Sequence, residues 1–339
     1  MAANLDAANL DIVTGGAGFI GSHMVDRLLR AGRDVRVIDN FSNGARRNLA
    51  HHEGNRQLEV LEADIAEEKA IEGMFDGADR VFHFAALADI VPSIEKPRDY
   101  FRANVDGTFH VLEQAKKARV RRLLYAASST CYGIPDVFPT PETAPISTKY
   151  PYALTKNLGE QLVMHWAEVY KLPALSLRMF NVYGPRARTG GTYGAVFGVF
   201  LAQLLAKRPL TIVGDGTQTR DFTYVTDVVE AFLAAANSEK TATVYNVGSG
   251  GTYSVNNLIS LLGTNNIVHI PKRPGEPDCT FADTAKIERD LGWKAKVSFE
   301  RGVGEMLKHI DAWRDAPVWT PEKIGEATQG WFKYLGGTN

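Results

Sequence analysis

Short apolar runs rich in β-branched residues alternate, along the first half of the chain, with segments whose apolar residues recur at helical spacing. The runs are "DIVTG", "DVRVID", "LEVLEAD", "RVFHFAA", "RLLYAASS" and "ALSLRMFN". Helical patterns lie between them, notably at Ser22 to Ala31, Tyr100 to Ala118 and Ala153 to Tyr170. Strands that are apolar on both faces and separated by helices are typical of parallel βαβ units. The pattern therefore predicts an α/β fold with a doubly wound parallel sheet over residues 10–180.

After about residue 180 the regular alternation of predicted strands and helices gives way to loops rich in Gly, Pro, Arg and Thr. Helices are expected near 197–206 and 225–236, and strands at "LTIVGDG" and "TVYNVGS". We expect a smaller C-terminal α/β lobe at 181–312, lying over the carboxyl edge of the sheet where ligands bind in such folds. Segments at about 220–248 are expected to return to the first domain. The remaining tail, 313–339, carries three of the five tryptophans and is interpreted as an element for packing or subunit contact.

Composition narrows the classes of partner. Lys plus Arg number 38 and Asp plus Glu 39, so a net charge of −1 offers no general attraction to nucleic acid or to an anionic membrane. Any phosphate group must therefore be bound locally. Two cysteines, Cys131 and Cys279, cannot form a disulfide framework or a cysteine-based metal site, which favours a reducing, cytoplasmic setting.

No stretch of the sequence predicts membrane insertion or export. The first residues, "MAANLDAANL", lack a basic region and a continuous apolar region, and we expect them to be disordered. The longest apolar stretch, "GAVFGVFLAQLLA", is too short and too rich in glycine to span a bilayer. We expect a soluble, cytoplasmic protein.

The stretch "IVTGGAGFIGSH" joins the first predicted strand to the first helix. Gly15, Gly18 and Gly21 give G-x-x-G-x-x-G, and Gly16, Gly18 and Gly21 also satisfy G-x-G-x-x-G. Glycine suits a sharp turn at which a pyrophosphate approaches the backbone and the helix packs closely on the strand. The phosphate would then lie on the exposed amides of the helix start. The pattern predicts the phosphate-binding turn of a Rossmann-type dinucleotide-binding domain, although such a loop taken alone could also be an ordinary strand-to-helix turn.

An acidic residue follows at the expected distance. Asp39 lies 18 residues after Gly21, where such folds place a carboxylate that accepts hydrogen bonds from the adenosine ribose. A carboxylate there would repel a 2′-phosphate, which favours NAD over NADP, although Arg46 and Arg47 lie nearby. Asp39 could also be a turn residue that ends a strand. Other cofactor-binding candidates around the glycine turn and the next strands are Phe19, Ile20, Asn40, Asp64, Ile65, Ala85 and Ala86. Asp64 could instead cap a helix, and the alanines could be core residues.

The predicted helix after the fifth strand carries a candidate base. In "YPYALTK", Tyr152 and Lys156 are four residues apart and share one helical face. A nearby ammonium favours the phenolate and is expected to lower the pKa of the tyrosine. Ser128 ends the preceding strand, where it could hold a substrate hydroxyl while Tyr152 takes its proton. Cys131 has no basic partner in sequence and is interpreted as a buried neighbour.

These motifs, taken in order, carry a resemblance. The stretches "TGGAGFIGSH", "NVDGT", "SSTCYG", "YPYALTK", "RMFNVYGPR", "GDGTQTRDFTYVTDVV", "YNVGSG" and "RPGEPDCTFADTAKIERDLGW" resemble the extended short-chain dehydrogenase/reductase family, in particular its NAD-dependent nucleotide-sugar epimerases and dehydratases. The resemblance covers about residues 10 to 310. It implies NAD as cofactor and a nucleotide-diphosphate sugar as substrate.

The resemblance also implies roles for individual residues. Ser128, Tyr152 and Lys156 would be the catalytic trio, with Asn104 beside them as a structural or relay residue. Asn104, Tyr152 and Lys156 are also expected to contact the cofactor. The implied substrate contacts are Ser128, Ser129, Thr130, Asn181, Arg220, Arg273, Glu276 and Thr280. Of these, the two arginines would meet the diphosphate, for which paired guanidiniums are suited, and Glu276 would lie near the nucleotide ribose. Each arginine taken alone could equally form a surface ion pair.

The residues after Ser128 favour one reaction. The resembling 4,6-dehydratases carry an Asp-Glu pair there, and the nucleotide-glucuronate decarboxylases usually carry a glutamate at the second position. Here these positions hold Ser129 and Thr130, whose hydroxyls cannot replace carboxyl groups as general acid and base. We therefore expect a 4-epimerase that acts through a transient 4-keto sugar. A dehydratase, a decarboxylase, a 4-dehydrogenase and a non-enzymatic dinucleotide-sensing protein remain alternatives.

Three further expectations concern substrate, assembly and metal. Thr280 is small enough to leave room for an N-acetyl group, and "NVYGPRARTGGTYGAV" resembles UDP-N-acetylhexosamine 4-epimerases, so a UDP-hexose or UDP-N-acetylhexosamine is expected. The resemblance implies a homodimer joined through the helices at about 100–118 and 153–170. The apolar residues there could equally be core residues; they are Phe101, Val105, Leu158 and Leu162.

The eight histidines show no spacing typical of metal ligands, so no metal is expected.

Overall fold

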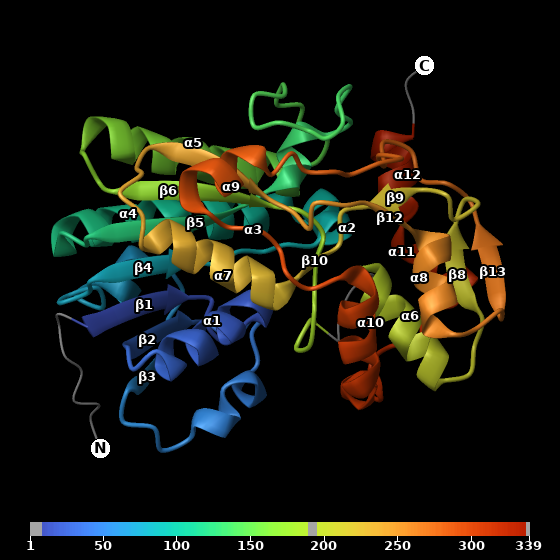
Figure 1. Ribbon diagram of the computed structural model, residues 1–339, viewed down its shortest axis with the longest axis horizontal. Helices are drawn as coiled ribbons and strands as arrows, with labels where there is room; N and C mark the ends of the chain where they lie inside the picture. Colours follow the sequence, from blue (N-terminus) through green and yellow to red (C-terminus); the bar gives the residue numbers. More distant parts are fainter. Residues whose placement is uncertain (1–8, 189–194, 337–339) are drawn as a thin grey trace.

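The computed structural model describes residues 9–188 and 195–336 and centres on a seven-stranded parallel sheet (Figure 1). The strands lie in the order β11-β6-β5-β4-β1-β2-β3. Their bounds are β1 Leu10–Thr14, β2 Asp34–Asp39, β3 Leu58–Glu62, β4 Arg80–His83, β5 Arg122–Ser128, β6 Ala174–Met179 and β11 Thr243–Val247. The predicted doubly wound parallel sheet is therefore confirmed. The expected disordered start, at residues 1–8, lies outside the described residues.

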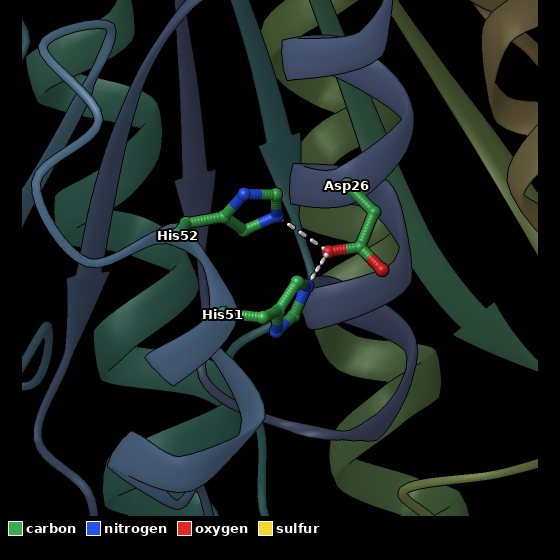
Figure 2. Close-up of side chains that lie close together, drawn as sticks. All are labelled: Asp26, His51 and His52. Carbon is green, nitrogen blue, oxygen red and sulfur yellow. Dashed lines mark hydrogen bonds and ion pairs between the residues drawn. The ribbon is translucent and has the colours of Figure 1, made fainter.

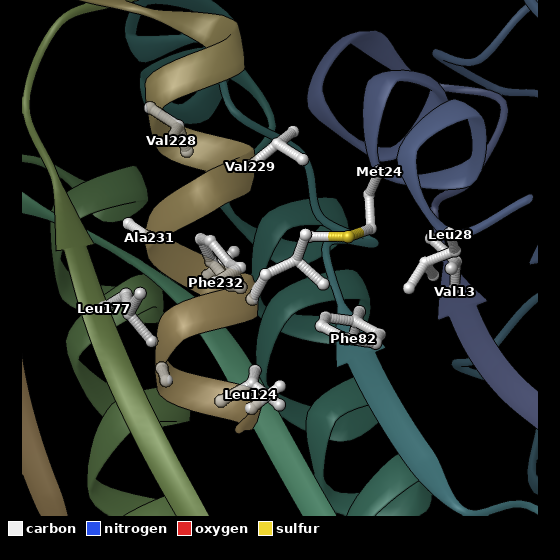
Figure 3. Packing of buried hydrophobic residues seen from close by; sticks show 14 of the residues in the cluster. Val13, Met24, Leu28, Phe82, Leu124, Leu177, Val228, Val229, Ala231 and Phe232 are labelled. Atoms are coloured by element: carbon white, nitrogen blue, oxygen red, sulfur yellow. The ribbon is translucent and has the colours of Figure 1, made fainter. Parts of the chain in front are cut away.

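Helices cover both faces of this sheet. On one face α1, Phe19–Arg30, packs beside α7, Val225–Ala236. Figure 3 shows Val228 and Phe232 of α7 with Met24 of α1 above the apolar side chains of the strands. On the other face lie α4, Gly107–Ala118, and α5, Pro151–Val169. Burial of the sheet on both faces accounts for the nearly continuous apolar runs of its strands.

A smaller lobe follows β6 and has its own aromatic core. The core includes Tyr183, Phe197, Phe222 and Phe299, whose rings stack or meet edge to face. The remaining strands are β7 Val182–Tyr183, β8 Leu210–Val213, β9 Thr219–Arg220, β10 Thr223–Tyr224, β12 Tyr253–Ser254 and β13 Ile267–Ile270. The remaining α-helices are α2 Ile90–Glu95, α3 Pro97–Phe101, α6 Val196–Leu205, α8 Val255–Leu262, α9 Ala285–Leu291, α10 Phe299–Lys308, α11 Pro321–Ala327 and α12 Gln329–Leu335.

Short 3-10 turns complete the path of the chain, at η2 Arg46–Asn48, η3 Ala50–His52, η4 Glu68–Ile71, η6 Ser129–Tyr132 and η7 Ile310–Trp313. Among the described residues, no helix is both long enough and apolar enough to cross a bilayer.

The helix expected over Tyr100 to Ala118 is not regular. A single π-helical turn, η5 Arg102–Asp106, separates α3 from α4. Within this turn the buried Asn104 side chain bonds both backbone groups of Leu87, at 2.8 and 3.0 Å, and the Thr155 hydroxyl at 3.0 Å. These bonds link the loop after β4 to α5, so the widened turn keeps the asparagine facing inward. Such turns occur frequently at functional sites.

A buried ion pair holds α5 against the sheet. Glu160 of α5 accepts from the guanidinium of Arg178 on β6 at 2.5 Å and from the Ser176 hydroxyl at 2.7 Å. Both ionised side chains are less than a tenth exposed. Arg178 also donates to the Tyr132 hydroxyl at 2.8 Å. Because both charges are buried and bonded, removing one partner leaves the other unpaired in a low-dielectric environment.

The first helix is also bonded to the loop after β7. His23 of α1 donates through Nε2 to the Pro185 carbonyl at 2.9 Å, and its Nδ1 lies 3.1 Å from the Arg186 guanidinium, a permanent donor. Burial and the Arg186 charge lower the pKa of His23 to about 4. Folded His23 is therefore neutral throughout the physiological range.

We predict that Glu160→Ala destabilises the protein by about 3 to 5 kcal/mol, because it leaves Arg178 buried without its counter-ion. Urea unfolding would measure the change. The exposed pair of Glu230 and Arg27, 2.6 Å apart, provides the control. Glu230→Ala should cost less than about 1 kcal/mol. Equal effects of the two substitutions would contradict the importance of the buried pair.

We predict that stability falls as the pH drops below 6.5, in part because of His23. An unfolded histidine takes up a proton near pH 6.5, whereas folded His23 does so only near pH 4. Between these values the unfolded state binds the extra proton, which costs about 1.4 kcal/mol of stability per pH unit. His23→Gln should flatten this slope in urea unfolding between pH 7.5 and 4.5, while its amide can still donate to Pro185. Identical slopes would show that His23 is not responsible.

Candidate functional site

The glycine turn between β1 and α1 is shaped by close backbone contacts. Gly15 has a φ of +69°, and a Cβ there would lie 2.7 Å from the Ala85 nitrogen. A Cβ on Gly21 would lie 2.2 Å from the Gly15 carbonyl oxygen. Gly18 is the N-cap of α1, and within the described chain no side chain caps this helix end. The amides of Phe19 and Ile20 therefore begin the helix without an intrahelical acceptor, which fits a bound phosphate group.

Asp39 lies at the end of β2 beside this turn. Its two carboxylate oxygens accept from the amides of Ala17 at 2.9 Å and Phe41 at 2.8 Å. Burial raises the pKa of Asp39, although both amides oppose the shift. Each carboxylate oxygen keeps a further lone pair for a ribose hydroxyl. The adjacent Asn40 is exposed and accepts from Ser42.

The other cofactor candidates lie at the ends of the next strands. Asp64 follows β3 and accepts from the Ala66 amide and from Arg102, each at 3.0 Å, so it forms a local turn rather than a helix cap. Ile65 is buried in the core. Ala85 and Ala86 follow β4 and are partly exposed, and Ala85 also packs against the core of the sheet. Asn104 makes the bonds to Leu87 and Thr155 described above.

Ser128 and Tyr152 meet at the carboxyl edge of the sheet. Ser128 ends β5, Tyr152 lies in the first turn of α5, and a hydrogen bond joins their side chains. The ring of Tyr100 packs edge-on against Tyr152, with centroids 6.4 Å apart. Burial raises the pKa of Tyr152, and the Ser128 hydrogen bond only partly opposes it. The expectation that the protein itself lowers this pKa is therefore wrong, because desolvation raises it and the nearby charge of Asp89 adds to the shift.

Lys156 lies behind this pair and is 5% exposed. Its ammonium nitrogen lies 4.4 Å from the centre of the Tyr125 ring. Burial lowers the pKa of Lys156 to about 7, and the Glu160 carboxylate one turn further along α5 opposes the shift. The lysine therefore gains and loses its proton near neutral pH, which is typical of a group that takes part in proton transfer.

The two residues after Ser128 lie in η6. The Thr130 hydroxyl is 2.9 Å from the Ser128 hydroxyl, and Ser129 is partly buried. Cys131 is buried, which raises the pKa of its thiol to about 12 and excludes a thiolate nucleophile at neutral pH. This agrees with its interpretation as a buried neighbour.

Sequence reasoning missed an acidic group near Tyr152. Asp89, at the start of α2, bonds to Arg188 through its carboxylate and to the Tyr100 hydroxyl through its amide, the latter at 3.1 Å. Burial raises the pKa of Asp89, and its charge in turn raises that of Tyr152. Asp89 stands in "HFAALAD", next to the small residues that the sequence singled out. Only the fold, however, brings Arg188 across to it.

At the lobe side of the site, Glu276 lies between the two candidate arginines. Its Oε1 accepts from Arg220 at 2.9 Å, and its Oε2 lies 3.7 Å from Arg273. Oε2 is buried and has no hydrogen-bond partner among the described residues. Arg220 and Glu276 line a cavity of about 380 Å³ with Gln218, Lys272 and Pro277. A buried acceptor without a donor suits a ligand that brings a hydroxyl group.

Asn181 and Thr280 lie together at the mouth of the site. The Thr280 hydroxyl donates to the Asn181 side-chain oxygen at 2.7 Å and accepts from the Asp221 amide at 3.1 Å. Asn181 is exposed and Thr280 partly exposed. The stretch "NVYGPRARTGGTYGAV" begins at Asn181, but its residues 189–194 lie outside the described residues.

The structure also brings together a group with metal-ligand chemistry that the sequence did not reveal. The Nε2 atoms of His51 and His52 each lie 2.8 Å from the same oxygen of Asp26 (Figure 2). The other oxygen of Asp26 is bonded to Arg186, and together with the histidines this guanidinium lowers the pKa of Asp26 to about 2. The guanidinium places a positive charge where a cation would bind, so we interpret the group as a hydrogen-bonded link between α1, η3 and the loop after β7.

Apolar side chains remain exposed on the helices expected to join two subunits. Phe101 is 47% exposed, and Leu154 of α5 is 45% exposed. Val105, Leu158 and Leu162 are partly buried rather than fully enclosed.

The chain is similar to a family of known proteins over most of its length. The profile of the NAD dependent epimerase/dehydratase family matches residues 12–248. A UDP-glucuronic acid decarboxylase from Arabidopsis thaliana is 35% identical over 88% of this chain and 67% of the relative. The crystal structure of UDP-glucose 4-epimerase from Thermotoga maritima with UDP-glucose has a TM-score of 0.84 and 35% identity, covering 89% of this chain and 99% of the other.

A third similar structure is UDP-glucuronic acid 4-epimerase from Bacillus cereus in complex with UDP-glucuronic acid and NAD. It has a TM-score of 0.82 and 31% identity, covering 89% of this chain and 99% of the other. The family, the fold and the NAD cofactor predicted from the sequence are confirmed, and the relatives are enzymes that act on nucleotide sugars. This chain belongs to the NAD dependent epimerase/dehydratase family.

Proposed function

We propose that this protein is a nucleotide-sugar 4-epimerase that acts through a transient 4-keto sugar, on a UDP-hexose or a UDP-N-acetylhexosamine. The proposal rests on one observation: Ser128 interacts with Tyr152 and is followed in sequence by two further hydroxyl residues, Ser129 and Thr130. Oxidation and reduction at one carbon need a single proton acceptor and donor, which this pair supplies. A dehydratase also needs groups that remove the C5 proton and protonate the leaving hydroxyl, and Ser129 and Thr130 cannot fill those roles.

The described residues fit NAD. The uncapped start of α1 would hold the pyrophosphate, Asp39 the adenosine ribose, and the small Ala85 and Ala86 would leave room beside β4. NAD held there would supply the hydride acceptor and donor for oxidation and reduction at C4 of the sugar.

The chain's own residues move the accompanying proton. Ser128 would hold the C4 hydroxyl, and Tyr152 would take its proton and give it back once the sugar has presented its other face. The raised pKa of Tyr152 in the protein alone makes its ionised form a stronger base for the first step and its phenol a weaker acid for the return step. For the first step it must be ionised, and protonated Lys156 on the same face of α5 would stabilise the phenolate.

The lobe would hold the nucleotide diphosphate. Arg220 and Arg273 suit the two phosphates, and Oε2 of Glu276, which accepts no hydrogen bond from the described residues, suits a ribose hydroxyl. Asn181 would contact the substrate near the sugar. Thr280 beside it leaves space at the C2 substituent, which supports the acceptance of 2-acetamido sugars.

Decarboxylation of a nucleotide-glucuronate is the second candidate. It is favoured by the Arabidopsis relative, which is as similar in sequence as the Thermotoga epimerase. The hydroxyl at Thr130, in place of the usual glutamate, favours epimerisation.

We also propose a homodimer joined through α4 and α5, supported by exposed apolar residues such as Leu154.

The first prediction from this proposal concerns products. Incubated with NAD and a panel of UDP-, GDP-, CDP- and dTDP-hexoses, hexosamines and hexuronates, the protein should give the C4 epimer of a UDP-hexose or UDP-N-acetylhexosamine without net NADH. Proton NMR would follow C4, and absorbance would follow NADH. A keto product, a lost C6 group or stoichiometric NADH would overturn epimerisation, and no turnover of UDP-N-acetylglucosamine would remove the role of Thr280.

The second prediction concerns the base. Tyr152→Phe should lower kcat by about 10²- to 10⁴-fold, because the proton acceptor is lost. NAD binding, measured by calorimetry, should be retained. Tyr170→Phe, which alters an exposed tyrosine just beyond the end of the same helix, is the matched control and should leave kcat unchanged. Near-normal turnover by Tyr152→Phe would exclude this tyrosine as the base.

A further inference from the structure

The C-terminal helices cross from the lobe to the sheet domain. Trp313 of η7, which precedes these helices, is buried in the lobe core. Ile324 of α11, the first of them, lies in the same core. The next helix, α12, packs against α2, which follows β4 of the main sheet (Figure 1). The tail is therefore anchored in one domain and ends against the other, on the side where the candidate site lies.

One side chain of α12 reaches the candidate diphosphate site. Trp331 is 3% exposed and donates from Nε1 to the Pro274 carbonyl at 2.7 Å. The guanidinium carbon of Arg273 lies 5.7 Å from the centre of the indole. The Trp331 ring also lies 6.0 Å, centroid to centroid, from that of Tyr150, the N-cap residue of the catalytic helix α5. The indole thus touches both the arginine loop and the start of α5.

These contacts restrict Arg273 through two neighbours. The indole face attracts the guanidinium, and the Glu276 carboxylate lies 3.7 Å from the Arg273 Nε. The bond to Pro274 holds the backbone of the same loop. A free arginine loses substantial rotamer entropy when it binds a phosphate, so an arginine that is already ordered binds more tightly.

We propose that Trp331 is a positioning residue of the substrate site, which orders Arg273 for the diphosphate of the nucleotide sugar. This inference rests on the proposed function, in which Arg273 binds that diphosphate. It gives the tail a role in substrate affinity, whereas its sequence had indicated only packing or subunit contact. Because Trp331 acts before the chemical step, its loss weakens ground and transition states equally, so KM rises and kcat is unchanged.

The test is a double-substitution cycle measured by calorimetry, with UDP as the probe and the NAD-loaded protein in the cell. Trp331→Ala should weaken UDP binding about tenfold, as expected for a lost cation–π contact and a less ordered arginine. Trp331→Phe keeps an aromatic face and should show a smaller effect. In the Arg273→Ala background, Trp331→Ala should have little further effect, because the two residues act through one another.

Controls separate positioning from general loss of structure. Tyr334→Ala removes an exposed ring from the same helix and should leave UDP affinity unchanged. NAD affinity and the melting temperature report on folding, and Trp331→Phe serves if Trp331→Ala melts early. With the preferred sugar, the same variants should raise KM and leave kcat within about twofold of the parent.

The outcomes distinguish the two proposals. If Arg273→Ala weakens UDP binding but Trp331→Ala and Trp331→Phe do not, the role of Trp331 is overturned and the diphosphate site stands. If Arg273→Ala has no effect on UDP binding, the proposed diphosphate site is wrong, and a role of Trp331 through it falls as well. Equal losses of UDP and NAD affinity would also overturn positioning, because they would indicate a purely structural tryptophan.

Discussion

Parallel pairing of all seven strands is the constraint on which the candidate site depends. Because every strand runs the same way, every strand ends at one edge of the sheet. The glycine turn after β1, Asp39 at the end of β2, the alanines after β4 and Ser128 at the end of β5 therefore meet, although more than a hundred residues separate the first from the last. Burial of the sheet by helices on both faces leaves this edge as the place where polar side chains gather.

Desolvation governs the chemistry of the groups that meet there. Burial raises the pKa of Tyr152 and lowers that of Lys156 to about 7, so each group is driven toward its neutral form. The Ser128 hydrogen bond and the Glu160 carboxylate act in the opposite direction. Both shifts favour the neutral side chains, so ionising Tyr152 requires a change in its surroundings, such as the arrival of a positively charged cofactor.

Periodicity and local motifs were sufficient for most of the fold and part of the site. The helix expected at 225–236 matches α7, and the spacing of Tyr152 and Lys156 placed both on one face of α5. The π-turn could not be predicted, because it depends on bonds from Asn104 to Leu87 and to α5, which are distant in sequence. The pKa of Tyr152 was misjudged for a related reason, since burial is a property of the tertiary structure. The contact between Arg188 and Asp89 arises in the same way.

The π-turn at residues 102–106 also bears on how this segment tolerates changes in length. A π-turn accommodates one residue more than the regular helix that would replace it. Deleting a single residue there would restore an uninterrupted helix from α3 to α4, but each residue of a regular helix turns the chain by about 100°. Asn104 lies inside this turn, so its side chain would rotate away from Leu87 and Thr155. In this short stretch the length of the chain matters as much as the identity of its residues.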